Sequence, residues 1–238
     1  KIVGGSATYV GYSATKLGVN PKLVAVVGDD FPNETIADFK NVGFDLEGLQ
    51  VKQGEKTFFW SGRYHNDMNS RDTLITELNV LESFNPVIPD SYQDCTYLML
   101  GNLSPAIQAQ VINGMTNRPK LIAMDTMNFW MDIAMDDLKK TISMVDVLTI
   151  NDEEARQLSG EYSLLKAAEK IQEMGPRYII IKKGEHGALL FHGKEMFYAP
   201  ALLLPSVVDP TGAGDTFAGG FMGYLASTDD ISFENMKR

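Results

Sequence analysis

Short, almost uninterrupted apolar runs recur along this chain, with segments of helical spacing between them. A run without polar interruption fits a strand buried on both faces, as in a parallel sheet. The alternation predicts right-handed strand–helix–strand units and a three-layer α/β/α fold. The expected strands are residues 22–28, 97–101, 121–125, 145–150 and 178–182. The expected helices are residues 33–41, capped by Asn33, and residues 105–113, 136–143, 153–158 and 163–174.

Residues 56–78 follow a different pattern. Aromatic and polar side chains alternate there, a polar turn interrupts them, and the alternation then resumes. This predicts an antiparallel β-hairpin with one face in solvent, inserted into the α/β domain. Trp60, Arg63 and Tyr64 would be unusual on an idle exposed edge, so we expect a lid over a site rather than a plain excursion of the chain. An exposed strand edge also invites pairing, which predicts a homodimer through the hairpin sheet.

Charge and composition exclude several classes of protein. The chain has 238 residues, which suits one domain over residues 1–238, and a net charge of -10 at pH 7. This charge argues against a nucleic-acid surface. No apolar run approaches the roughly 20 residues that span a membrane. The single cysteine, Cys95, and the lack of a secretory signal predict a cytoplasmic protein. An anionic ligand would need local help from helix N-termini, lysines or a metal.

Residues 207–226 (VVDPTGAGDTFAGGFMGYLA) combine small residues, two aspartates and an apolar helical run. Gly212 and Gly214 allow the backbone to turn sharply and to approach a ligand without a Cβ clash. A helix that begins near Ala213 would aim its first unpaired amides at one point and favour an anion there. Asp215 then has two interpretations: a carboxylate that stabilises the helix N-terminus, or a general base beside an oxyanion site. The further glycines predict that this helix packs very closely within the protein.

Residues 209–217 (DPTGAGDTF), continued by residues 219–221 (GGF), resemble the C-terminal signature of the PfkB, or ribokinase-like, carbohydrate kinases. The resemblance implies the ribokinase-like (Rossmann-like) form of the three-layer fold, and ATP and Mg²⁺ as cofactors. It implies that Asp215 is the base that takes a proton from the attacking hydroxyl. It also implies an anion hole for the γ-phosphoryl group, formed by the amides of Gly212, Ala213 and Gly214.

Two further motifs follow the family's order, and each has a plainer alternative. Residues 151–154 (NDEE) end one expected strand and open a helix, and they resemble the family's NxxE. By resemblance, Asn151 approaches the phosphates and Glu154 orients a water on Mg²⁺; the alternative is an N-cap with acids in the first turn. Residues 182–187 (KKGEHG) resemble KxGxxG, and the alternative there is a basic hairpin turn. The residues that would meet nucleotide phosphate in this motif are Lys182, Gly184 and Gly187.

The first residues of the chain resemble the family's acceptor motif. Gly4 and Gly5 match the glycines of GGxxxN, which border the acceptor, but Tyr9 stands where the family has an Asn that contacts a sugar hydroxyl. Residues 125–128 (DTMN) resemble a DxN segment at a strand end. The family's first strand and its C-terminal segment have no counterpart here, so we expect both ends of the domain to be cut.

Some family members hold a monovalent cation such as K⁺ beside the glycine-rich loop. Asp209 and Thr211 stand where two of its ligands would come from, and the others would lie beyond Arg238.

The sequence as a whole predicts an ATP-dependent kinase that phosphorylates a hydroxymethyl group of a sugar or sugar-like molecule. An adenosine-type nucleoside kinase of the same family shares every motif, and Tyr9 and the aromatic hairpin would suit base stacking. A non-catalytic nucleotide sensor is an alternative of another class, although it need not retain Asp215. We expect an ordinary aspartate pKa of about 3.9 for this base. The motifs do not name the acceptor.

Overall fold

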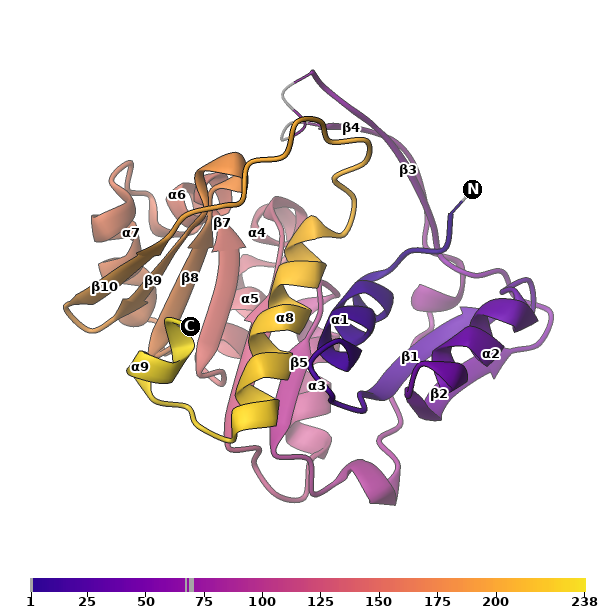
Figure 1. The fold of residues 1–238 in the computed structure, drawn as a ribbon. Coiled ribbons are helices and arrows are strands. Elements are labelled where there is room, and N and C mark those ends of the chain that lie inside the picture. Colours follow the sequence, from indigo (N-terminus) through magenta and orange to yellow (C-terminus); the bar gives the residue numbers. More distant parts are fainter. Residues whose placement is uncertain (1, 67, 69–70) are drawn as a thin grey trace.

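A six-stranded sheet forms the centre of the computed structural model, which describes residues 2–66, 68 and 71–238 (Figure 1). Its strand order is β10-β9-β8-β7-β6-β5. Strands β5 to β8 pair in parallel, and the β8–β9 and β9–β10 pairs are antiparallel. The predicted parallel sheet is therefore confirmed. The strands are β5 (Tyr97–Leu100), β6 (Leu121–Asp125), β7 (Val147–Asn151), β8 (Tyr178–Lys182), β9 (Ala188–His192) and β10 (Glu195–Ala199).

The apolar runs are buried on both faces of this sheet, as predicted. Along β6, Ile122 and Met124 join one core cluster, whereas Leu121 and Ala123 join another on the opposite face. This alternation follows from the period of two in a strand. The helices that pack on the Ile122 face are α3 (Pro105–Gly114), α4 (Asn128–Ile133), α5 (Met135–Ile142), α6 (Asp152–Ser159) and α7 (Leu164–Gln172).

Two helices on the other face lie side by side and complete the third layer: α1 (Ser6–Thr15) and α8 (Ala213–Thr228) (Figure 1). A Cβ added at Gly219 would lie 2.2 Å from the Val10 carbonyl oxygen, and one at Gly223 would lie 2.9 Å from Ala14 Cα. The two backbones therefore touch through glycines. Because Val10 meets Gly219 and the later residue Ala14 meets the later residue Gly223, the helices run in the same direction. The short helix α9 (Phe233–Met236) follows α8.

A smaller unit stands beside the main sheet. Strand β1 (Lys22–Gly28) pairs in parallel with β2 (Asp45–Lys52) and, among the described residues, not with the six-stranded sheet. Helix α2 (Asn33–Asn41) packs on this pair. Its core is aromatic: Phe39 stacks on Phe44 at 5.0 Å between ring centroids, and Tyr12 of α1 meets both rings edge-on.

The predicted hairpin is present as β3 (Phe59–Tyr64) and β4 (Arg71–Glu77), which pair antiparallel. Residues 67, 69 and 70 of its expected polar turn lie outside the described residues. The expected alternation of buried and wet faces is wrong for β4, whose neighbouring side chains Leu74 and Ile75 are 55% and 48% exposed. A two-stranded ribbon that stands away from the main sheet has little to bury either face against.

Two details differ from the sequence-based expectations. Asn33 does not cap α2, because the helix begins one residue earlier than a cap at Asn33 requires and Pro32 occupies the cap position. Strands β2, β9 and β10 and helix α4 were not predicted. None of the described helices is both long and apolar enough to cross a bilayer.

The contact between α1 and α8 makes a testable pair of substitutions. Gly219→Ala forces the new methyl group against the Val10 backbone and should destabilise the fold by about 1–3 kcal/mol. Gly220→Ala meets only the Ser13 hydroxyl at 3.4 Å, and alanine is the better helix former by roughly 1 kcal/mol. Thermal unfolding should therefore show a loss for Gly219→Ala and none for Gly220→Ala. Equal effects would mean that the helices are not in backbone contact.

Candidate active site

Three polar side chains end three neighbouring parallel strands. Asp125 ends β6, Asn151 ends β7 and Lys182 ends β8. Asn151 is the register partner of Lys182, and Asp125 pairs in register with Thr149 on β7. The carboxyl ends of parallel strands form one edge, where α/β sheets bind ligands. The fold therefore brings these three residues to a single edge of the sheet.

The N-termini of α1 and α8 converge on this edge. Gly212 caps α8 in the left-handed region (φ 77°), and a Cβ there would lie 2.3 Å from the Tyr9 ring. The Ala213 amide donates to the Pro210 carbonyl, so it is not available in this structure as the predicted anion-hole donor. The amides of Gly214 and Asp215 have no hydrogen-bond acceptor in the described part of the chain. Two helix ends with unpaired amides favour an anion.

Asp215 lies half-buried in the first turn of α8. Burial raises its pKa to about 6, and the negative charge of Asp125 adds to this effect. A hydrogen bond from Ser6 at the start of α1 and the nearby Lys182 ammonium oppose the increase. Our expectation of an ordinary aspartate pKa is thus wrong: the folded protein makes Asp215 a stronger base.

Lys182 brings positive charge to the same place. Its Nζ lies 3.2 Å and 3.4 Å from the two carboxylate oxygens of Asp125. A Cβ added at Gly214 would lie 3.0 Å from this Nζ, so the ammonium sits directly beside the first turn of α8. Lys182 is therefore shared between the sheet edge and the helix N-terminus.

Two tyrosines contact the glycine-rich loop that leads into α8. The Tyr9 ring lies over Gly212, and its hydroxyl is near Gly4. Burial raises the pKa of Tyr9, and the charges of Asp209 and Asp215 add to the increase. Tyr64 at the end of β3 accepts a hydrogen bond from the Thr211 hydroxyl at 3.1 Å. The hairpin thus reaches the glycine-rich loop, as a lid would.

Asn151 and Glu154 form a complete capping box at the start of α6. The Asn151 side chain accepts from the Glu154 amide at 2.8 Å, and the Glu154 carboxylate accepts from the Asn151 amide at 2.7 Å. The plainer interpretation of this motif is therefore realised. The box also fixes the buried Glu154 carboxylate at the strand end.

The predicted phosphate loop is the tight turn between β8 and β9. Gly184 and Gly187 have φ of 55° and 80°, and the Lys183 amide donates to the Gly187 carbonyl at 2.8 Å. A Cβ at Gly187 would lie 2.0 Å from the Ala199 carbonyl oxygen, so close packing of the backbone alone explains a glycine at this position. The turn still follows Lys182 directly, at the edge where the other site residues gather.

The remaining predicted residues surround this centre. Gly5 caps α1 with φ 96°, and the Gly4 carbonyl accepts from the Thr8 hydroxyl. The Asp209 carboxylate accepts from the Thr211 amide at 2.9 Å, and hydrogen bonds from Thr211 lower the pKa of Asp209.

The sequence analysis placed Asp125 in the DTMN segment at a strand end but did not pair it with Lys182, and it did not identify Ser6. Ser6 carries no signal in the sequence.

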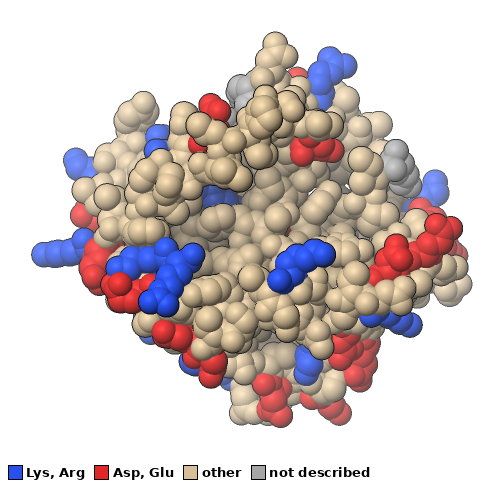
Figure 2. Space-filling model, viewed as in Figure 1, with Lys and Arg blue, Asp and Glu red and all other residues tan. Residues whose placement is uncertain are grey.

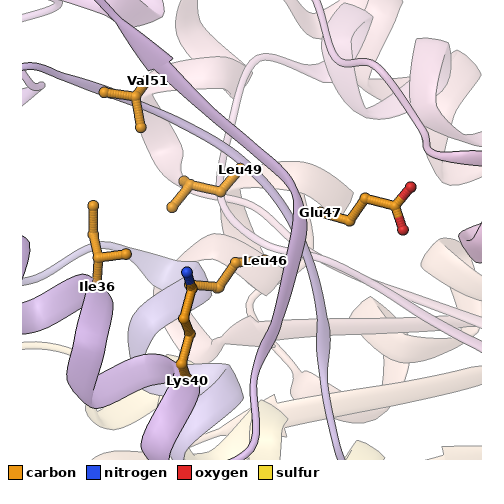
Figure 3. Close-up of a pocket in the computed structure, with 6 residues that line it drawn as sticks. All are labelled: Ile36, Lys40, Leu46, Glu47, Leu49 and Val51. Carbon is orange, nitrogen blue, oxygen red and sulfur yellow. The ribbon is translucent and has the colours of Figure 1, made fainter.

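A separate pocket of 380 Å³ lies between α2 and β2 (Figure 3). Its walls are mostly aliphatic, and its charged members are Lys40 and Glu47. It holds neither an unpaired helix end nor any of the predicted site residues. We therefore place the functional site at Asp215 and not in this pocket.

The distribution of surface charge agrees with a functional site at Asp215. In Figure 2 acidic side chains gather over α2 and along the lower rim, whereas the hollow in the middle of this face has few acidic atoms at its surface. Among the described residues, no group of three or more His, Cys, Asp and Glu side chains could hold a metal by itself.

Comparisons with known proteins agree with this architecture. The family model for pfkB family carbohydrate kinases matches residues 1–233. A cytidine kinase of Thermococcus kodakarensis is 30% identical over 224 residues, which cover 92% of this chain and 78% of the relative. The solved nucleoside kinase of Methanocaldococcus jannaschii has a TM-score of 0.78 at 21% identity and covers 98% of this chain and 76% of its own. A solved E. coli structure in complex with ATP and Mg²⁺ has a TM-score of 0.81 at 22% identity, with coverage of 98% and 78%.

The raised pKa of Asp215 has a consequence for stability. An acid whose folded pKa of about 6 exceeds its ordinary value of 3.8 destabilises the fold above pH 6, where the folded state must bury the charge. Asp215→Asn should therefore stabilise the protein at pH 8 by up to about 3 kcal/mol. The gain should shrink as the pH falls from 6 towards 4. Denaturant unfolding at pH 8 and pH 4 measures the difference; a gain that does not change with pH would contradict the assigned pKa.

Proposed function

Because the chain belongs to the pfkB family of carbohydrate kinases, we propose that it transfers the γ-phosphoryl group of ATP to a hydroxymethyl group at the Asp215 site. The acceptor is a sugar or a nucleoside. One observation carries the assignment of the site: a carboxylate of raised pKa, two unpaired helix amides and a lysine ammonium meet at the carboxyl edge of the sheet. Base, anion site and counter-charge are what phosphoryl transfer requires.

The Asp215 carboxylate acts on the acceptor. As the acceptor hydroxyl attacks, it donates its proton to Asp215, whose pKa of about 6 makes it a better base than an ordinary aspartate. An alcohol is still a far weaker acid, so the proton moves late, as charge develops. Positioning and charge stabilisation by the Gly214 and Asp215 amides and by Lys182 supply most of the acceleration.

The nucleotide lies along the ends of β7 and β8 in this proposal. The side chain of Lys182 and the turn at Gly184 face the phosphates, and Asn151 lies beside them in register. The family uses ATP with Mg²⁺, which neutralises phosphate charge when bound. A nucleotide-borne Mg²⁺ keeps several waters and needs only one or two carboxylates. The buried Glu154 carboxylate fits that requirement and would hold one such water.

We also propose a monovalent cation site beside the glycine-rich loop. Asp209 and Thr211 would offer oxygen ligands from the loop before α8, and the turn between them is already ordered by their hydrogen bond. Turnover measured in K⁺ and in tetramethylammonium chloride tests it: equal rates would rule out a cation site.

A nucleoside is the acceptor class that the aromatic walls favour. Tyr9, where the family has an Asn, lies near both Asp215 and Tyr64 of the hairpin, and flat rings suit a nucleobase. The relative that is 30% identical is a cytidine kinase, which points the same way. A sensor without turnover would have no use for the raised pKa of Asp215.

The hairpin is proposed as a lid, because Tyr64 contacts Thr211 of the glycine-rich loop. Its exposed β4 residues Leu74 and Ile75 support a homodimer through the hairpin sheets. Sedimentation equilibrium of the chain and of a Leu74→Lys, Ile75→Lys variant tests this pairing. A monomeric wild type would exclude it.

The direct test is ATP consumption with a panel of sugars and nucleosides. We expect turnover with at least one acceptor, and Asp215→Asn should lower kcat by about 10²–10⁴-fold without loss of ATP binding. Asp137→Asn, an exposed aspartate on α5, is the charge-matched control and should keep full activity.

The pH profile gives the second readout. Below about pH 6, kcat/KM for the acceptor should fall tenfold per pH unit as Asp215 is protonated. Near-normal turnover by Asp215→Asn would overturn the mechanism. ATP binding without turnover by any acceptor would favour the sensor.

A further inference from the structure

Asp125 is buried at the end of β6, and the proposed mechanism gives it no role. Its side chain is 8% exposed, and one carboxylate oxygen accepts from the Thr126 amide at 3.0 Å. The same carboxylate holds Lys182 Nζ through both oxygens, and the Lys182 side chain is 17% exposed. A buried carboxylate is costly unless it is paired, so this pair is an integral part of the sheet edge.

The Asp125–Lys182 pair lies beside the proposed anion site at the first turn of α8. A Cβ at Gly214 would approach Lys182 Nζ to 3.0 Å, so the ammonium lies directly against the first turn of α8. Without a ligand, Asp125 is the ion-pair partner of Lys182 in the described part of the chain. A phosphate group that reached the Gly214 amide would compete with Asp125 for the same ammonium.

Asp125 also faces the proposed base. The groups around Asp215 are Ser6 and Tyr9 from α1, Lys182 from β8 and Asp125 from β6. Asp125 is the one member of this set that brings a second negative charge. Its removal would make the site more attractive to an anion and Asp215 a weaker base.

We propose that Asp125 is a positioning residue that holds the Lys182 ammonium beside the first turn of α8 and competes with phosphate for it. This rests on the proposed function. When a phosphate arrives, the ammonium turns from Asp125 to the phosphate; when the product leaves, Asp125 takes the ammonium back. The carboxylate thereby weakens nucleotide binding, eases product release and keeps Asp215 basic.

Two readouts that a purely structural residue would not move test this. Asp125→Asn keeps the oxygen that accepts from Thr126 but removes the charge, so ATP should bind at least about threefold more tightly in a calorimetric titration without acceptor. With acceptor, kcat should fall, and the acid limb of kcat/KM should move to lower pH. Asp125→Glu should restore values nearer to wild type, and Asp137→Asn controls for net charge.

The outcomes separate this inference from the proposed function, because the titration contains no acceptor. A folded Asp125→Asn variant that binds ATP equally or more weakly overturns the role of Asp125 even if the chain is an active kinase. If the Asp125→Asn variant does not fold, an NMR measurement on the wild-type protein tests the role of Asp125 instead. The carboxyl ¹³C signal of Asp125 should shift when a non-hydrolysable MgATP analogue is added, because the carboxylate loses its ammonium partner, and no shift would contradict the proposal.

Discussion

The backbone contact between α1 and α8 is the constraint on which the rest of the site depends. Glycines at 219 and 223 let the two helices approach until one backbone touches the other. Because the helices run in the same direction, this contact brings both N-termini together and places Ser6 and Tyr9 of α1 beside Asp215 of α8. A side chain at Gly219 would separate the helices and, with them, the hydroxyl, the carboxylate and the amides that act together.

The proposed phosphate site must attract an anion although the whole chain is negatively charged. The protein carries a net charge of -10, yet the proposed ligand is a polyphosphate. Two helix N-termini and one ammonium provide local attraction, whereas Asp125 and Asp215 oppose it. The opposition has a use, because the same low-dielectric crowding of carboxylates raises the pKa of the base. In the proposed mechanism, the site gives up some nucleotide affinity and gains a base whose pKa of about 6 is near neutral pH.

Much of this was predictable from the sequence. Strands β1, β6 and β8 have the predicted bounds because each is an apolar run with a clear end, and the helix start at Ala213 followed from its glycines. Strands β2 and β10 were missed because they mix polar and apolar residues at partly exposed edges. Strand β9 is a buried, largely apolar run inside the sheet and could have been predicted. The Asp125–Lys182 pair depends on the register of three strands, and the contact of Ser6 with Asp215 on helix packing. Neither depends on a local pattern. The raised pKa of Asp215 likewise arises from burial, which a motif does not encode.

The most direct test of the account is where MgATP touches the chain. An amide ¹H–¹⁵N titration with a non-hydrolysable MgATP analogue reports each backbone N–H separately. We expect the largest shifts at Gly214 and Asp215, whose amides have no acceptor among the described residues, followed by Lys182 and Gly184 at the end of β8. Shifts that instead cluster around Ile36, Lys40 and Leu49, in the pocket between α2 and β2, would contradict it.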